Sequence, residues 1–160
     1  MTKSEIHQQF VDQLAAEVDT ITAAARSSFD TATNEEHHAE GKYDTFSLES
    51  SYLARGQAKR VEELTTALDR LQMLPMKTFS ATTPIVLSAL VRMEAENGEK
   101  RTVFLGPSAG GEEFLADGEE IVIVTSGSPM GQAILGKRVG ATFDIKLGPI
   151  AQTFTITSVE

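Results

Sequence analysis

The sequence predicts an α+β protein in which a helical hairpin precedes a small β-rich domain. Apolar residues recur at three- and four-residue spacing through the first 75 positions, which indicates helices. After Pro75 the chain has short alternating runs of β-branched residues, which indicate strands. We therefore expect a hairpin domain over residues 1–75, a linker over 76–84 and a sheet domain over 85–160.

The first helix is predicted from Ser4 to about His38, because this stretch holds neither proline nor glycine. Thr2 or Ser4 offers the side-chain oxygen that a helix start prefers. Its apolar stripe consists of Ile6, Phe10, Leu14, Val18, Ile21, Ala25, Phe29 and Ala32.

The second helix is predicted from about Thr45 to Leu74, and Pro75 cannot continue it. Its stripe consists of Leu48, Tyr52, Val61, Leu64, Leu68 and Leu71. Gly41 lies between the two helices, where the chain is expected to reverse. Two such helices would form an antiparallel arm about 45 Å long, at 1.5 Å per residue.

The second half is expected to be a compact antiparallel sheet of four to five strands with one short helix. The candidate strands are 85–94, 101–106, 120–125, 142–147 and 154–159. Asn97 and Gly98 form a strong hairpin-turn signal between the first two strands. The helix would begin with Ser128 as its cap and Pro129 as its first residue, and would end near Gly136.

The composition of the 160 residues is that of a globular protein, with 41% hydrophobic and 23% charged residues. No run approaches the ~18 apolar residues of a membrane span, and no secretion signal is recognisable. The absence of cysteine excludes disulfides and thiolate metal sites, and agrees with a cytoplasmic location. A net charge of −9 argues against binding to bare DNA and would suit a basic protein surface as partner. The alternative is ordinary acidic solubility, so charge alone does not identify a partner.

The segment 126–140, Ser-Gly-Ser-Pro-Met-Gly-Gln-Ala-Ile-Leu-Gly-Lys-Arg-Val-Gly, is the most specific stretch of the chain. It resembles the signature of the C-terminal domain in the Gre family of bacterial transcription elongation factors. The strands expected before and after this segment also match the family's order. The resemblance covers essentially the whole chain, although the hairpin matches mainly in length and pattern.

The resemblance implies a fold and a partner. In the family, a C-terminal domain similar in fold to FK506-binding proteins docks at the mouth of the secondary channel of RNA polymerase. The hairpin enters the channel, and acids at its tip help to hold a Mg²⁺ ion of the polymerase and promote cleavage of backtracked RNA. The polymerase supplies the catalytic centre, so we expect that the chain alone is not an enzyme and that it binds no metal ion when free. We also expect a monomer.

The hairpin tip departs from the family pattern. Alignment on Arg60 and Val61 places the first family acid at Glu40 and the second at Tyr43, with Asp44 one residue later. Glu40 and Asp44 are therefore the candidate Mg²⁺-assisting acids. The alternative is that both residues solvate a loop and Asp44 caps the second helix.

Two further groups are candidate contact residues. Lys42, Tyr43, Arg55 and Lys59 would contact the polymerase or the 3′ end of the nascent RNA. The alternative for the basic residues among them is charge balance with Glu62 and Glu63 on a surface helix. Ser128, Pro129, Met130 and Gly131 would form the docking motif for the polymerase, or alternatively serve the structure alone.

Three functions therefore remain open from the sequence. The first is a factor that stimulates RNA cleavage by the polymerase through Glu40 and Asp44. The second, an alternative, is a regulator with the same body that occupies the channel with little cleavage activity, and the altered tip is what separates it from the first. The third is a stand-alone coiled-coil interaction protein, against which the segment 126–140 argues.

Overall fold

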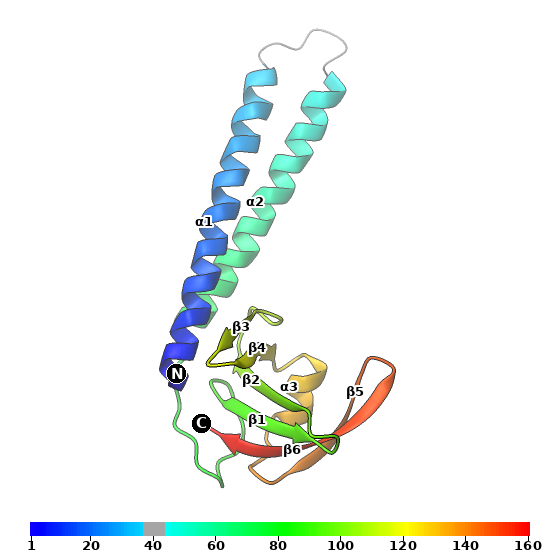
Figure 1. Cartoon of the computed structure of the whole chain (residues 1–160). Helices are drawn as coiled ribbons and strands as arrows, with labels where there is room; N and C mark the ends of the chain where they lie inside the picture. Colours follow the sequence, from blue (N-terminus) through cyan, green and yellow to red (C-terminus); the bar gives the residue numbers. More distant parts are fainter. Residues whose placement is uncertain (37–43) are drawn as a thin grey trace. The chain divides into compact units, whose positions relative to one another are not determined.

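The computed structural model describes the backbone of residues 1–36 and 44–160, with side chains except at positions 32, 34–50 and 147. In the described residues, two long helices precede a six-stranded sheet and one short helix (Figure 1). The predicted α+β class is confirmed. None of the described helices is long and apolar enough to cross a membrane.

The chain divides into two compact units. The sheet unit comprises Met1–Val11 and Asp69–Glu160, and the arm unit comprises Asp12–Leu68. The first residues of the first helix and the last residues of the second therefore group with the sheet. The predicted division into residues 1–75, 76–84 and 85–160 stays a prediction about independently folding domains.

The two long helices begin and end close to their predicted positions. Helix α1 is Lys3–Glu36 and helix α2 is Asp44–Gln72. Thr2 caps α1, because its hydroxyl accepts the Glu5 N–H at 3.3 Å and its own N–H donates to the Glu5 carboxylate at 2.6 Å. This reciprocal pair is a capping box, which satisfies two backbone donors that the helix start leaves unpaired.

The arm unit buries only part of each predicted stripe. Leu14 and Leu64 are buried, whereas Phe29 is 63% and Tyr52 is 67% exposed. The prediction that Phe29 and Tyr52 belong to the packed stripes is therefore wrong. At 3.6 residues per turn, Tyr52 is rotated by about 120° from Leu64, which turns it out of the seam between the helices.

The helices of the arm run antiparallel (Figure 1). The Arg60 guanidinium lies 3.8 Å from the Glu17 carboxylate, which fixes the register between α1 and α2 at this level. Positions one turn further along each helix face the same seam. The seam of the arm unit therefore contains the buried Leu14 and Leu64 and half-buried residues that include Val18, Ile21, Gln57 and Val61.

The sheet has the strand order β3-β4-β2-β1-β6-β5. Its strands are β1 (Leu90–Ala95), β2 (Lys100–Gly106), β3 (Glu113–Ala116), β4 (Glu119–Thr125), β5 (Thr142–Leu147) and β6 (Ile150–Val159). The predicted hairpin at Asn97 and Gly98 is confirmed, because β1 and β2 pair antiparallel and Gly98 has a φ of 85°. The short helix α3 (Pro129–Ile134) is also where the sequence predicts it.

Three strand predictions are wrong in part. Residues 85–89 are not strand, because Ser88 has a φ of 76° and its N–H donates to the carbonyl of Leu105. Their apolar character reflects burial rather than pairing. Strand β3 was not expected, because its four residues lie at a sheet edge and are largely exposed. The sheet is not purely antiparallel, since β2 and β4 pair in parallel.

Both faces of the sheet are covered by apolar side chains. One face packs with α3, in a cluster that includes Met93, Val103, Met130, Ile134 and Phe154. Alternate positions on the strands point to the other face. These positions and the helix ends contribute a second set of buried side chains: Ile6, Phe10, Leu71, Leu74, Leu90, Phe104, Ile121 and Ile123.

Phe10 is the centre of the second face. Its ring centroid lies 4.6 Å from that of Phe114 in an edge-to-face arrangement and 6.1 Å from that of Phe104. Phe10 is 1% exposed, so its whole side chain is removed from water. This contact joins the first turns of α1 to strands β2 and β3 within the sheet unit.

We expect Phe10→Ala to lower the free energy of unfolding by about 3–5 kcal/mol, because it removes a buried ring and leaves a cavity. Phe29→Ala is the matched control and should change it by less than about 0.5 kcal/mol, since Phe29 is largely exposed. Urea denaturation followed by circular dichroism measures both. Equal effects of the two substitutions would contradict the packing described for Phe10.

Candidate functional site

The segment that carries the family resemblance forms the turn after β4 and helix α3. Ser128 caps this helix, because its hydroxyl accepts the Gly131 N–H at 3.1 Å and donates to the Thr125 carbonyl at 2.8 Å. Pro129 occupies the first helical turn, where its missing N–H leaves no hydrogen bond unmade. The serine and the proline therefore define where α3 begins.

Gly131 is required by the closeness of the backbone before the helix. A Cβ at this position would lie 1.9 Å from the Thr125 carbonyl oxygen and 3.1 Å from the Ser128 hydroxyl. No side chain fits at 1.9 Å from a backbone atom, so the helix passes the end of β4 at a distance that only glycine allows.

The predicted docking residues differ in their exposure. Met130 and Gly131 are buried, and Met130 belongs to the cluster between α3 and the sheet. Pro129 is exposed, as is Gln132, which sequence reasoning did not single out. Leu135 is also exposed, so the expectation that it packs with Met130 and Ile134 is wrong. Pro129, Gln132 and Leu135 are spaced three residues apart, so they lie on the same side of α3, away from the buried positions. Docking by this motif stays a prediction, and its exposed residues include Pro129, Gln132 and Leu135.

The candidate residues at the hairpin tip are largely outside the described part of the chain. Glu40, Lys42 and Tyr43 lie outside the described residues. Asp44 is the first residue of α2, and its side chain is outside the description as well. The roles predicted for Glu40 and Asp44 stay predictions.

The candidate basic residues of α2 lie on its exposed surface. The Arg55 guanidinium lies over the Tyr52 ring, 5.9 Å from its centroid. Lys59 and Arg60 approach the Glu63 carboxylate at 4.0 and 3.9 Å. Such exposed pairs stabilise a helix by only about 0.3–0.5 kcal/mol. Charge balance with Glu63 therefore accounts for the position of Lys59, whereas Arg55 is held beside an exposed aromatic ring.

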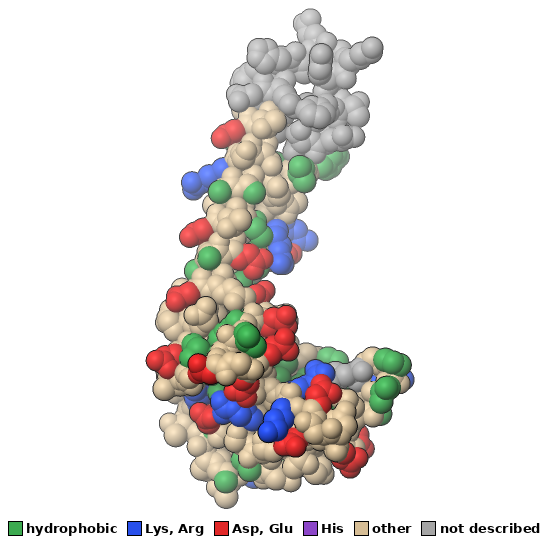
Figure 2. Space-filling model, viewed as in Figure 1, with side chains coloured by type: hydrophobic (Ala, Val, Ile, Leu, Met, Phe, Trp, Pro, Cys, Tyr) green, Lys and Arg blue, Asp and Glu red, His purple; other side chains and the backbone are tan. Residues whose placement is uncertain are grey.

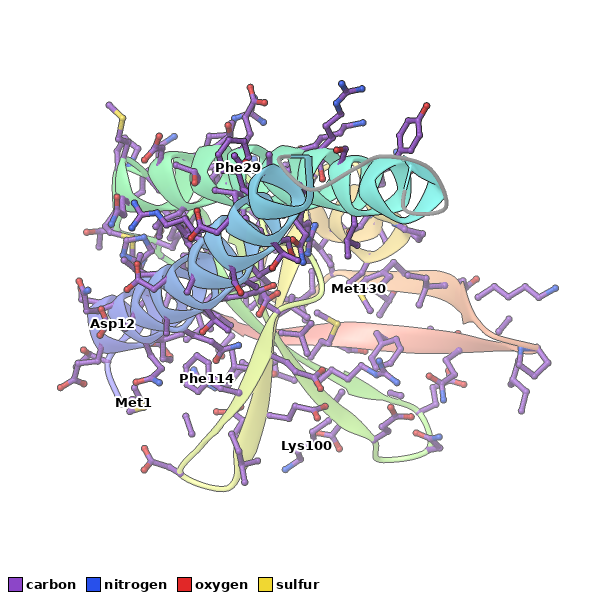
Figure 3. All side chains as sticks on the ribbon, turned by 90° about the horizontal axis from the view of Figure 1, so that it is seen from above. Met1, Asp12, Phe29, Lys100, Phe114 and Met130 are labelled. Atoms are coloured by element: carbon purple, nitrogen blue, oxygen red, sulfur yellow. The ribbon has the colours of Figure 1, made fainter. Side chains whose placement is uncertain are left out.

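A groove of about 630 Å³ lies on the sheet unit and was not anticipated from the sequence. It is lined by residues of β2 and β4 and by Met130 of α3. Lys100 and Met130 are labelled in Figure 3, and Figure 2 shows acidic and basic side chains interspersed on one face of the molecule. Charged residues of its rim pair with one another, as the 2.6 Å contact between Arg101 and Glu99 shows.

Glu119 lies at the margin of this groove in a small polar network. Its carboxylate accepts hydrogen bonds from the Arg92 guanidinium, at 3.0 Å, and from the Thr102 hydroxyl. Burial raises the pKa of Glu119, but the hydrogen bonds from Thr102 and Arg92 outweigh it and hold the pKa below its ordinary value. The ionised carboxylate therefore stabilises the fold above its ordinary pKa, and this contribution is lost as the pH falls through the folded value.

The described residues contain no group of three or more histidine, cysteine, aspartate or glutamate side chains that would hold a metal ion. The pairs around Glu119 and Glu99 are explained by neutralisation of neighbouring charges. In the part of the chain that the structure describes, the polar side chains at the margin of this groove are engaged with one another, as the contacts of Glu119 with Arg92 and Thr102 show.

Several solved structures are similar to this chain over 62–94% of its length. They include Gfh1 of Thermus aquaticus, at 18% identity, 92% coverage of each chain and a TM-score of 0.39. Gfh1 of Thermus thermophilus, a GreA factor homologue, is also 18% identical, with 94% coverage of each chain and a TM-score of 0.39. The elongation factor GreA/GreB of Nitrosomonas europaea is 20% identical over 62% of this chain and 78% of its own, with a TM-score of 0.36.

At these identities and TM-scores, the similarities establish neither a family nor a function. Comparison with protein-family models finds no match, and comparison with curated protein sequences finds none either.

We expect Gly131→Ala to lower the free energy of unfolding by at least about 2 kcal/mol, because the added methyl group overlaps the Thr125 carbonyl. Gly127→Ala is the matched control, since a Cβ there meets nothing within 4 Å. It should change the stability by less than about 0.5 kcal/mol. Thermal and urea unfolding of the two variants test this. If Gly131→Ala has the same free energy of unfolding as the unsubstituted chain, the close approach to Thr125 is absent.

Proposed function

We propose that this chain binds RNA polymerase and acts on transcription by placing its helical arm in the secondary channel of the enzyme. The observation that carries the proposal is the segment 126–140, whose order of serine, proline, glycines and apolar residues resembles the Gre family signature. In this proposal the outer face of α3 contacts the rim of the channel through Pro129, Gln132 and Leu135.

The length of the arm supports the proposal. Helix α1 has 34 residues and α2 has 29, so the helices extend for about 51 Å and about 44 Å at 1.5 Å per residue. A narrow two-helix arm has little core of its own and is suited to a confined space in a partner. Its surface carries the exposed side chains of Phe29, Tyr52 and Arg55, which are available for contact.

The charge of the chain is consistent with such a partner. A protein with a net charge of −9 is repelled by bare nucleic acid and attracted by the basic surfaces that surround nucleic acid in a polymerase. The basic residues of the arm, Arg55 and Lys59 among them, would then meet RNA phosphate only where the partner neutralises the acids nearby.

Stimulation of RNA cleavage is the first form of this function. Cleavage of a phosphodiester by two metal ions requires oxygen ligands for the second ion. Mg²⁺ prefers carboxylates and water, and Glu40 and Asp44 are the carboxylates that the sequence offers at the tip. In this form the two residues would help to hold a Mg²⁺ ion that belongs to the polymerase, and the chain has no catalytic activity of its own.

Occupation of the channel without stimulation of cleavage is the second form. The alignment puts Tyr43 where the family has its second acid. The acid Asp44 lies one residue further along the chain. This substitution favours a regulator that competes for the channel. Both forms require the same binding to RNA polymerase and differ only at the tip.

A transcript-cleavage assay on backtracked elongation complexes distinguishes the two forms. The intact chain is compared with Glu40→Ala, Asp44→Ala and the control Asp30→Ala, an exposed acid on α1. If the tip holds Mg²⁺, each tip variant should lower the cleavage rate roughly tenfold or more, as loss of a metal-supporting residue does. Asp30→Ala should cleave like the intact chain.

Binding to the polymerase is measured in the same samples by co-sedimentation. Binding without cleavage, even at high concentration of the intact chain, would support the channel-occupying form and contradict the Mg²⁺ role of Glu40 and Asp44. Absence of binding by the folded chain would overturn the proposal in both forms.

A further inference from the structure

The seam between α1 and α2 changes in composition along the arm. Toward the start of α1 and the end of α2, the seam contains the large apolar residues Leu14, Val18, Val61 and Leu64, of which the two leucines are buried. Within 22–33 of α1 and 51–56 of α2, where side chains are described except at position 32, the half-buried positions hold no large apolar residue: they are Thr22, Ala25, Ser28, Thr33, Ser51 and Ala54. Small side chains remove less apolar surface from water, so the seam is weaker there.

Gln57 separates these two regions. The contact between Glu17 and Arg60 sets the register, and one turn from each of them toward the tip brings Gln57 to the level of Ile21. The Gln57 side-chain oxygen is buried and has no hydrogen-bond partner among the described residues. A buried acceptor without a partner opposes the packing around it, because its hydrogen bonds to water are lost on folding.

Two further observations also indicate that the outer part of the arm is less stable than the inner part. Gly56 lies beside Gln57 within α2, where glycine is less favourable than alanine, and a Cβ there would meet nothing within 4 Å. Among the described side chains of the outer part, the large apolar residues Phe29, Tyr52 and Leu53 are each more than half exposed instead of packed in the seam. Phe29 is labelled on α1 in Figure 3.

We propose that the arm consists of two zones of different stability, which meet at Gln57 and Ile21. The outer zone, 22–33 with 51–56, opens reversibly while the inner zone, 12–21 with 57–68, stays folded. Opening exposes the Gln57 amide to water and disrupts only small apolar contacts, whereas the inner zone would have to expose Leu14 and Leu64. An arm of this kind can adjust its outer surface to an enclosing partner without unfolding as a whole.

Amide hydrogen exchange of the intact chain, followed by mass spectrometry, tests the two zones directly. Peptides from 22–33 and 44–56 should exchange at least about tenfold faster, after correction for intrinsic rates, than peptides from 12–20 and 60–68. The experiment uses the chain without any partner, so its outcome does not depend on the proposed binding to RNA polymerase.

Three variants locate the boundary. Gln57→Leu should slow exchange of the outer zone roughly tenfold, because it replaces the unpartnered amide with an apolar side chain. Gly56→Ala, a second variant that preserves the seam, should slow it roughly threefold through helix propensity alone. Gln72→Leu is the control for composition, since Gln72 is exposed at the end of α2, and it should leave outer-zone exchange unchanged.

Equal protection of the two zones in the intact chain would overturn the proposal. So would a Gln57→Leu variant whose outer zone exchanges at the original rate, because the unpartnered oxygen would then have no effect on opening. Slowing in Gln72→Leu as large as in Gln57→Leu would assign the effect to overall hydrophobicity and would also overturn it.

Discussion

The packing of Phe10 against Phe104 and Phe114 is the contact on which the arrangement of the sheet unit depends. The sheet has apolar residues on both faces, and α3 covers only one of them. The first turns of α1 and the last turn of α2 supply the cover for the other, with Phe10 at 1% exposure as the largest contribution. The first turns of α1 and helix α3 therefore pack on opposite faces of the same sheet. This arrangement lets one small unit carry both the base of the arm and the motif that we propose for docking.

The segment 126–140 is explained in large part by structural requirements. Ser128, Gly131 and the buried Met130 are explained by a helix cap, a close backbone approach and core packing. These requirements fix the direction of α3 and leave Pro129, Gln132 and Leu135 on its exposed side. If α3 docks on a polymerase, the buried residues act through the shape they impose, and the exposed three make the contact.

The sequence predicted elements where a local signal was strong. Thr2 or Ser4, Pro75, the Asn97-Gly98 pair and the Ser128-Pro129 pair mark boundaries through backbone chemistry, and the helices and the first hairpin lie where these residues place them. The prediction from sequence failed where the pairing of a strand, or the side of a helix that faces its neighbour, depends on residues far apart in the sequence. Strand β3 is a short edge strand without an alternating apolar pattern. The parallel pairing of β2 and β4 has no signal in the local sequence. Tyr52 fits the three- and four-residue spacing of a helix stripe, yet its side chain faces water. The groove and the network of Arg92, Thr102 and Glu119 unite residues far apart in sequence, so spacing alone did not reveal them.

The central claim, that the arm enters RNA polymerase, is tested most directly by site-specific photocrosslinking. A photoreactive phenylalanine replaces Leu53, which is 59% exposed on α2, or Leu115, which is 73% exposed on β3 of the sheet unit. The account predicts that the group at position 53 crosslinks to polymerase segments lining the secondary channel, and that the group at position 115 does not. Crosslinks from position 53 to the outer surface alone, in complexes where binding is detected, would contradict it.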